Sequence, residues 1–525
     1  MLIKISLLFL FFAVTIFIGI YFRKRASNVN DFVLGGRNVG PWLSAFSYGA
    51  TYFSAVVFVG YAGQFGWRFG TAAVWIGLGN AFVGSLMAWF ILGRRTRIMT
   101  NHLKSATMPE FFNSRYLSPA LKIGASIIIF IFLIPYTASL YNGLSRLFSM
   151  AFGVPFEYCI IAMGILTAVF VVAGGYFATA VNDFIQGSIM LIGITAVIAV
   201  VLRDNGGLLT AIDSLAKISD AGAARGTVPG VFTSFLGPDP ITLLGVFILT
   251  SLGTWGLPQM VARFYSIKSE KMITKGAIVS TIFAIIIAGG CYFLGSFGRL
   301  YSHMPEIYNA SGAVIFDAII PTILSGFSEV MIGLIIVLVF AASISTLSSL
   351  VMASSSTLTL DFIRGHIVKK ISDKSQLLII RILIVVFIII SSAIAIIQYN
   401  GGISFIAQLM GVSWGALAGS FLAPFLYGLY WKRTSRISVW CCFIFSVVLI
   451  SINLMVTLKV LPADILPQIL RSPINAGAFC MLAGLIIVPL VSSFTKAPDK
   501  AAVDRCFSCY DETVTVKVKD DLGSI

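Results

Sequence analysis

The stretch Phe340-Ala341-Ala342-Ser343-Ile344-Ser345-Thr346-Leu347-Ser348-Ser349-Leu350 brings small and hydroxyl residues to the end of an apolar helical segment. Residues three and four positions apart lie on one face of a helix. That face carries Ala342, Ser345, Thr346 and Ser349, with Ser348 beside them. Two interpretations are open. The oxygens could replace water around a small hard cation, or the hydroxyls could bond their own helix and let neighbouring helices approach.

The composition indicates a membrane protein. Of 525 residues, 58% are hydrophobic and 11% are charged, and the mean hydropathy is +0.96, which is far from the values of soluble proteins. Apolar stretches of about 20 residues, enough to cross about 30 Å of hydrocarbon, recur along the chain. We predict an all-α polytopic protein with thirteen spans at roughly 2–22, 41–65, 72–93, 120–150, 156–173, 178–202, 240–263, 276–299, 329–352, 377–398, 403–430, 438–457 and 474–494.

The distribution of basic residues predicts the orientation. The net charge is +15, but Lys and Arg form short clusters between apolar segments and no continuous face, so we expect no nucleic-acid partner. The clusters lie at 23–25, 94–97, 263–275, 364–374 and 432–436, with even numbers of spans between them. The positive-inside rule then places all of them in the cytoplasm. We predict a multi-pass protein in the bilayer of the cell membrane, with its N-terminus outside and its tail inside.

Two predicted spans are interrupted near their middle. The span 41–65 has small and polar residues at 47–54, and the span 240–263 contains Gly253, Gly256 and Pro258, which weaken a helix. Irregular backbone at membrane depth is tolerated where it lines a cavity. Because the second break comes five spans after the first, we predict a 5+5 inverted repeat with a substrate and ion site between its halves.

This arrangement predicts boundaries along the chain. They are 1–40 for the first span and its loop, 41–202 for repeat one, 203–239 for an external connection, 240–430 for repeat two, 431–494 for the last two spans and 495–525 for a cytoplasmic tail. Cys506 and Cys509 form a CxxC in this tail without a second pair, which favours reduced thiols over a metal site.

Asp183 is the acidic residue that we place well within a span. A charged side chain at the centre of a membrane helix costs about 2.5–3.5 kcal/mol and indicates a functional site with a partner. No Lys or Arg of the neighbouring spans is an obvious partner, so we expect a cation there, and oxygen ligands favour sodium over a transition metal. The alternative is that Asp183 caps a helix N-terminus at the membrane surface.

Four segments resemble the solute:sodium symporter family, whose members have a leucine-transporter-like fold. They are 31–37 (DFVLGGR), 174–187 (GG…NDFIQG), 258–264 (PQMVARF) and 342–349 (ASISTLSS), and the resemblance covers about residues 30–430. It implies thirteen spans with an outside N-terminus. It also implies sodium-driven transport of a small solute, since members carry sugars, proline, pantothenate, sialic acid and other compounds.

The resemblance also implies two sodium sites. The main site is expected to use the carbonyls of Ala50, Phe53 and Ala342 and the hydroxyls of Ser345 and Thr346. Some members have a second site, which in this chain would join Asp183 to the hydroxyls of Ser345, Ser348 and Ser349. Two sodium ions per substrate are then possible.

The substrate stays open among sialic acid or another organic acid, pantothenate and a sugar. Members that carry proline have an aspartate where this chain has Tyr52, and members that carry sialic acid hold its carboxylate with an arginine that the segment 134–141 lacks. A half-helix N-terminus at a break could receive a carboxylate instead. The candidate lining offers aromatic walls with a few polar groups, or plain helix packing, and consists of Thr51, Tyr52, Ser54, Phe58, Gln64, Tyr136, Thr137, Tyr141, Thr254, Trp255 and Gln259.

These observations predict a secondary symporter that imports a small polar organic solute together with sodium by alternating access. The alternatives are an uncoupled facilitator of the same fold and a transporter-like sensor. We expect no enzyme, because the sequence has no visible nucleophile–base pair or metal cluster.

Overall fold

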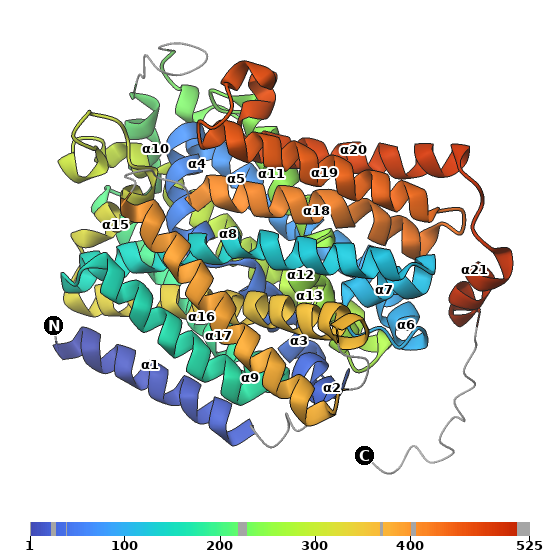
Figure 1. Ribbon diagram of the computed structural model, residues 1–525. Helices are drawn as coiled ribbons and strands as arrows, with labels where there is room; N and C mark the ends of the chain where they lie inside the picture. The colour runs from blue at the N-terminus through green and yellow to red at the C-terminus, as the bar shows by residue number, and fades with distance from the viewer. Residues whose placement is uncertain are drawn as a thin grey trace, which may run out of the picture.

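The computed structural model describes residues 2–22, 28–37, 39–218, 228–367, 371–400 and 406–511, which form a bundle of helices (Figure 1). Within these ranges, β structure is limited to two isolated bridges, Val39 with Ile267 and Tyr308 with Val314. The predicted all-α class is confirmed. The basic cluster predicted at 23–25 lies outside the described residues.

The helices follow one another along the chain in two groups, before and after the connection that precedes Pro240. The first part of the chain forms α1 (Leu2–Tyr21), α2 (Val29–Leu34), α3 (Pro41–Tyr52), α4 (Ala62–Phe69), α5 (Val74–Gly79), α6 (Arg94–His102), α7 (Met108–Tyr116), α8 (Pro119–Phe152), α9 (Phe156–Asp204) and α10 (Leu208–Ala216). The second part forms α11 (Pro240–Leu252), α12 (Pro258–Ser266), α13 (Ile273–Ala284), α14 (Gly290–Ser296), α15 (Phe316–Ser325), α16 (Glu329–Thr357), α17 (Asp373–Asn400), α18 (Ile406–Tyr430), α19 (Arg436–Thr457), α20 (Pro473–Phe494) and α21 (Lys500–Phe507). Turns of π-helix extend several of them, including Val56–Tyr61 before α4 and Leu358–Ile367 after α16.

Eleven helical segments of the described chain are long and apolar enough to cross a membrane, so the protein is multi-pass. The segment Val56–His102 contains 47 residues and would measure about 70 Å if it were straight, more than twice the hydrocarbon thickness. Gly70 lies in it with a φ of 60°, between two of the predicted spans. The total of thirteen spans and the inverted repeat stay predictions.

The break predicted in the span 41–65 is present. Helix α3 ends at Tyr52, and Phe53 has extended backbone angles, φ −109° and ψ 120°. The helix resumes at Ala55 and continues into the π-helical turns before α4. Because α3 stops inside the bundle, its last carbonyl groups lack the N–H donors that a continuing helix would supply.

The break predicted in the span 240–263 is also present. Helix α11 ends at Leu252, the turn Gly253–Trp255 follows, and α12 begins at Pro258. Proline suits the first turn of a helix, where its missing N–H has no helical partner to lose. Two short half-helices, α3 and α12, therefore meet in the interior, where they contact one another.

Helix α16 is the central helix of the bundle. All its residues from 335 to 352 are buried, because α1, α3, α8, α9, α12 and α17 pack around it. A helix that is buried on all sides needs no polar face toward solvent. Its hydroxyl groups therefore lie in the interior, beside the ends of the broken helices.

Helices α4 and α14 cross at glycines, and this crossing gives a test of the packing. A Cβ atom on Gly295 would lie 2.0 Å from the carbonyl oxygen of Ala62, which is backbone and cannot move aside. We expect Gly295→Ala to lower the free energy of unfolding by about 3 kcal/mol, at the upper end of overpacking effects. Thermal unfolding in detergent measures it. Gly289→Ala is the matched control, since nothing lies within 4 Å of its added Cβ, and equal melting temperatures of the two variants would contradict the crossing.

The described part of the tail, as far as residue 511, is docked on the bundle. Helix α21 lies beside α6 (Figure 1), and both Cys506 and Cys509 are buried. Lys432 donates a hydrogen bond of 2.7 Å to Asp504, which lowers the pKa of that carboxyl from its ordinary value. The guanidinium of Arg95 lies 4.6 Å from the centre of the Tyr510 ring.

Candidate functional site

Four oxygen atoms converge at Thr346, on the buried middle of α16. The Thr346 hydroxyl lies 3.2 Å from each of the carbonyl oxygens of Ala50, Thr51 and Ala342. Ala50 and Thr51 belong to the last turn of α3, whose carbonyl end carries the negative end of the helix dipole. The break in α3 thus directs negative potential at this oxygen cluster, which suits a small cation.

The main sodium site predicted from the family resemblance overlaps this cluster in part. Ala50, Ala342 and Thr346 contribute atoms to it. The Thr51 carbonyl, which the sequence analysis did not select for this role, also contributes. Phe53 lies in the break, and its N–H is bonded to the carbonyl of Gly49.

Asp183 links three helices in the interior. Its carboxylate is fully buried and accepts hydrogen bonds from Ser47 of α3 and, at 2.5 Å, from Ser345 of α16. Asp183 lies inside α9, eight residues beyond the kink at Gly175. The alternative that it caps a helix N-terminus at the membrane surface is therefore wrong.

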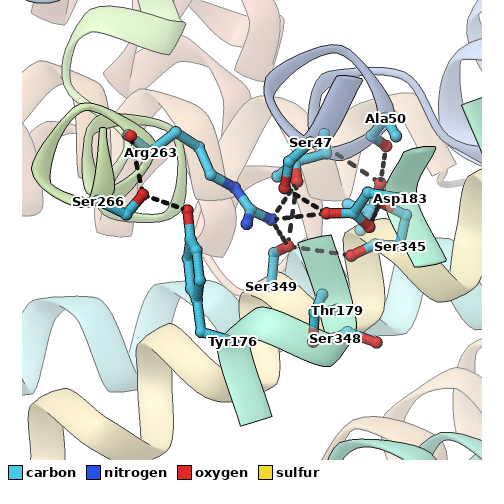
Figure 2. A network of polar contacts seen from close by, with 12 residues as sticks. Ser47, Ala50, Tyr176, Thr179, Asp183, Arg263, Ser266, Ser345, Ser348 and Ser349 are labelled. Carbon is cyan, nitrogen blue, oxygen red and sulfur yellow. Dashed lines mark hydrogen bonds and ion pairs between the residues drawn. The ribbon is translucent and has the colours of Figure 1, made fainter. Parts of the chain in front are cut away.

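Arg263 is the partner of Asp183, which corrects our expectation that no neighbouring Lys or Arg could serve. Its Nη2 atom lies 3.5 Å from the Asp183 carboxylate, donates to the Thr51 hydroxyl at 2.6 Å and donates to the Ser349 hydroxyl. Figure 2 shows the guanidinium pointing at the carboxylate between α3, α9 and α16. The guanidinium also lies 5.0 Å from the centre of the Tyr176 ring.

The sequence did not indicate this pair, because Arg263 stands at the start of the basic cluster 263–275 that was predicted to be a cytoplasmic loop. In the structure Arg263 belongs to α12 and its side chain is buried. A signal was available in the predicted break. A helix that restarts at Pro258 in mid-membrane carries the residue five positions later deep inside the bundle, not into a loop.

The two remaining serines of the predicted second site differ in their bonds. The Ser349 hydroxyl contacts the Thr51 hydroxyl at 3.0 Å and the carbonyl of Ser345 at 3.0 Å. The Ser348 hydroxyl donates to the Ile344 carbonyl of its own helix at 2.7 Å. Ser349 thus belongs to the polar network. Ser348 instead bonds a carbonyl of its own helix, which was the second of the two interpretations of the stretch 340–350.

Aromatic side chains gather beside the two breaks. The Tyr52 ring stacks on Phe53 with 4.2 Å between centroids, and it lies 6.2 Å from the ring of Trp414. Tyr136 meets Trp414 edge-on at 5.9 Å. Trp414 lies on α18 and was not among the predicted lining residues. The Tyr52 hydroxyl donates to the carbonyl of Thr250 at 2.5 Å, so this group is already bonded within the protein.

The other predicted lining residues are divided between two cavities and helix packing. Ser54 and Phe58 line a cavity of about 10 Å³ beside Phe53, the space of about one water molecule. Gln259 lines a second cavity of about 50 Å³ together with Arg263 and Ser349. The rest make bonds or contacts within the bundle, namely Thr137 to Leu133, Thr254 to Gly84 and Trp255 to Val83, with Gln64 and Tyr141 buried.

The described residues contain no set of ligands for a transition metal. Among them, no group of three or more His, Cys, Asp or Glu side chains could hold a metal ion. The oxygen cluster at Thr346 consists of carbonyl and hydroxyl oxygens, which are hard donors of the kind that hard cations prefer.

A helical membrane bundle with two broken helices around buried oxygen atoms is the arrangement of a transport protein. The model of the sodium:solute symporter family matches residues 32–444, and the chain belongs to this family. It is 28% identical over 513 residues to the osmoregulated proline transporter OpuE of Bacillus subtilis, covering 97% of this chain and 98% of the relative. It is 30% identical over 439 residues, 82% of each chain, to sodium/proline symporter 2 of Staphylococcus saprophyticus.

A solved structure shares the fold. A Na⁺-coupled sialic acid symporter in a substrate-bound, outward-open state superposes with a TM-score of 0.71 at 20% identity, over 95% of this chain and 99% of that chain. The match of the family model confirms the family predicted from the sequence motifs, and the family implies sodium as the coupling ion.

Proposed function

We propose that this protein imports a small polar organic solute by coupling its movement to an inward flow of sodium, with alternating access. The oxygen cluster at Thr346 carries the proposal. An ion there would bind carbonyl oxygens from the end of α3 and from α16, and so hold the broken helix against the central helix. Loss of the ion would free the two helices to separate and release the solute.

Thr346→Ala tests this site, because it removes the hydroxyl that contacts all three carbonyl groups. We expect the sodium concentration for half-maximal uptake to rise at least about tenfold, since a bond to a charged partner contributes about 1.5–3 kcal/mol. Initial uptake rates in proteoliposomes at increasing sodium measure it. Thr346→Ser keeps the hydroxyl and is the control. Equal sodium activation of Thr346→Ala and the wild type would contradict the site.

For the solute we propose a compound that combines an apolar body with a carboxylate or hydroxyl groups, such as sialic acid or another organic acid, pantothenate or a sugar. The aromatic group formed by Tyr52, Phe53, Tyr136 and Trp414 supports this choice, because such walls hold an organic body by stacking. Proline is a second candidate, since the two curated relatives are named as proline transporters. Tyr52 stands where proline carriers of the family have an aspartate, and its bonded hydroxyl supplies no negative charge.

Uptake of labelled solutes tests both the coupling and the substrate. Proteoliposomes would receive sialic acid, proline, pantothenate, glucose or short carboxylates, with an inward sodium gradient or with potassium in its place. We expect one solute to accumulate only with the sodium gradient. Equilibration of that solute without sodium would contradict coupling and favour the uncoupled facilitator.

We also propose that the two broken helices belong to a 5+5 inverted repeat, which makes up ten of thirteen spans, and that the N-terminus lies outside. Single cysteines in α21 and in the 203–239 connection would then react with a membrane-impermeant reagent from opposite sides. Labelling of both from the same side of intact cells would contradict this topology.

A further inference from the structure

A cavity of about 540 Å³ lies at one end of the bundle, away from the site at Thr346. It is bounded by the end of α7, the beginning of α19 and the connection from α20 to α21, and α7 and α21 lie at the right of Figure 1. Cavities of about 300–1,000 Å³ are the usual size for small-molecule sites. The transport function proposed above uses none of its residues.

The cavity is lined by three cationic side chains, Arg115, Arg436 and Lys496, and by one carboxylate, Asp499. Asp499 is already engaged, because it accepts the N–H of Ala502 at 3.0 Å and so caps α21. Arg436 and Lys496 are exposed. No ion pair of either is found within the described part of the chain. The cavity therefore carries an excess of positive charge.

Arg115 supplies a buried donor without an acceptor. The side chain is 2% exposed, its Nε donates to the Gly428 carbonyl at 2.9 Å, and its Nη2 donates to the Trp431 carbonyl at 3.1 Å. Its Nη1 has no partner. A buried N–H group without a hydrogen-bond partner costs free energy. An oxygen atom of a ligand in the cavity would give Arg115 Nη1 the acceptor that it lacks.

Helix termini add to the positive potential. Helix α19 begins at Arg436, and Ser435 before it caps the helix by accepting the N–H of Ser438 at 3.2 Å. The first N–H groups of a helix have no partners within it, and they carry the positive end of the dipole. The beginning of α19 thus faces the cavity in the way that helices bind phosphate groups.

Exposed apolar side chains in the lining of the cavity indicate which class of phosphate compound it binds. Leu117 and Ile437 line the same cavity, and they are 59% and 47% exposed. Phe494, at the end of the membrane helix α20, is 84% exposed. Cations beside exposed apolar groups at the end of membrane helices are the arrangement that binds anionic lipid headgroups. We propose that this cavity binds the phosphate group of an anionic phospholipid, with the acyl chains beside Leu117 and Ile437.

The test measures lipid binding to the full chain purified in detergent, with phosphatidylglycerol as the probe. Native mass spectrometry would count bound lipid as its concentration rises, with phosphatidylcholine as the neutral comparison. We expect Arg436→Gln/Lys496→Gln to weaken phosphatidylglycerol binding at least about tenfold, since each basic residue near an anionic surface gives about fivefold. Both side chains are exposed, so the variant is expected to fold. Lys271→Gln/Lys374→Gln is the matched control, because it removes two exposed charges that do not line the cavity.

Free phosphate separates the two possible sources of the ligand. Inorganic phosphate at millimolar concentration should leave phosphatidylglycerol binding unchanged if the acyl chains contribute. Displacement of the lipid by phosphate would overturn the lipid assignment and make the cavity a site for soluble phosphate groups. Equal phosphatidylglycerol binding by Arg436→Gln/Lys496→Gln and by Lys271→Gln/Lys374→Gln would overturn the site itself.

Discussion

Asp183→Asn is expected to lower sodium-driven uptake by more than about 100-fold. The amide keeps the shape of the carboxylate but removes its charge, so Arg263 is left as a buried guanidinium without a counter-ion. Breaking a buried ion pair from one side costs about 3–5 kcal/mol, which corresponds to a factor of at least about 100. The Ser47 and Ser345 hydroxyls, which donate to this carboxylate, lose their charged acceptor as well. Uptake with an inward sodium gradient measures the loss.

A double variant separates function from folding. Asp183→Asn/Arg263→Gln removes both charges, so the uncompensated buried charge disappears and the thermal stability should recover relative to Asp183→Asn. Sodium-driven uptake should not recover, because the carboxylate is still missing. If Asp183→Asn is activated by sodium as the wild type is, then Asp183 has no role in the transport cycle.

The sequence predicted those parts of the site whose signal is local. Both helix breaks follow from glycine, proline and small polar residues within about ten positions of one another, and the structure places them as expected. The burial of Asp183 follows from its place in an apolar segment. The hydroxyl groups of α16 also follow from their spacing on a single helix.

The sequence could not predict the contacts that depend on how distant helices meet. Arg263 lies 80 positions from Asp183 in the chain, and their approach depends on the direction that α12 takes after its break. Trp414 reaches Tyr52 because α18 packs against both breaks. The sequence of α18 itself does not indicate this contact. Docking of the tail through Arg95, Lys432 and α21 likewise joins segments far apart in the chain.

Arg263→Gln is expected to increase the affinity for sodium at least about tenfold. The guanidinium of Arg263 occupies the side of Asp183 where the predicted second sodium ion would sit. Two unit positive charges about 5 Å apart repel by about 3 kcal/mol at an effective dielectric constant of about 20. An ion at Asp183 and the guanidinium in this position therefore compete, and glutamine keeps a donor for Thr51 and Ser349 while it removes the charge.

Thermal unfolding at increasing sodium chloride measures this competition, because a ligand that binds the folded state raises its stability with concentration. Without sodium, Arg263→Gln should be less stable than the wild type, since Asp183 then lacks its partner. Sodium, but not choline, should restore the stability at concentrations that leave the wild type unchanged. Arg263→Lys keeps the positive charge and should respond to sodium as the wild type does. If Arg263→Gln also responds as the wild type does, then sodium does not bind at Asp183, and the coupling ion binds at Thr346 alone.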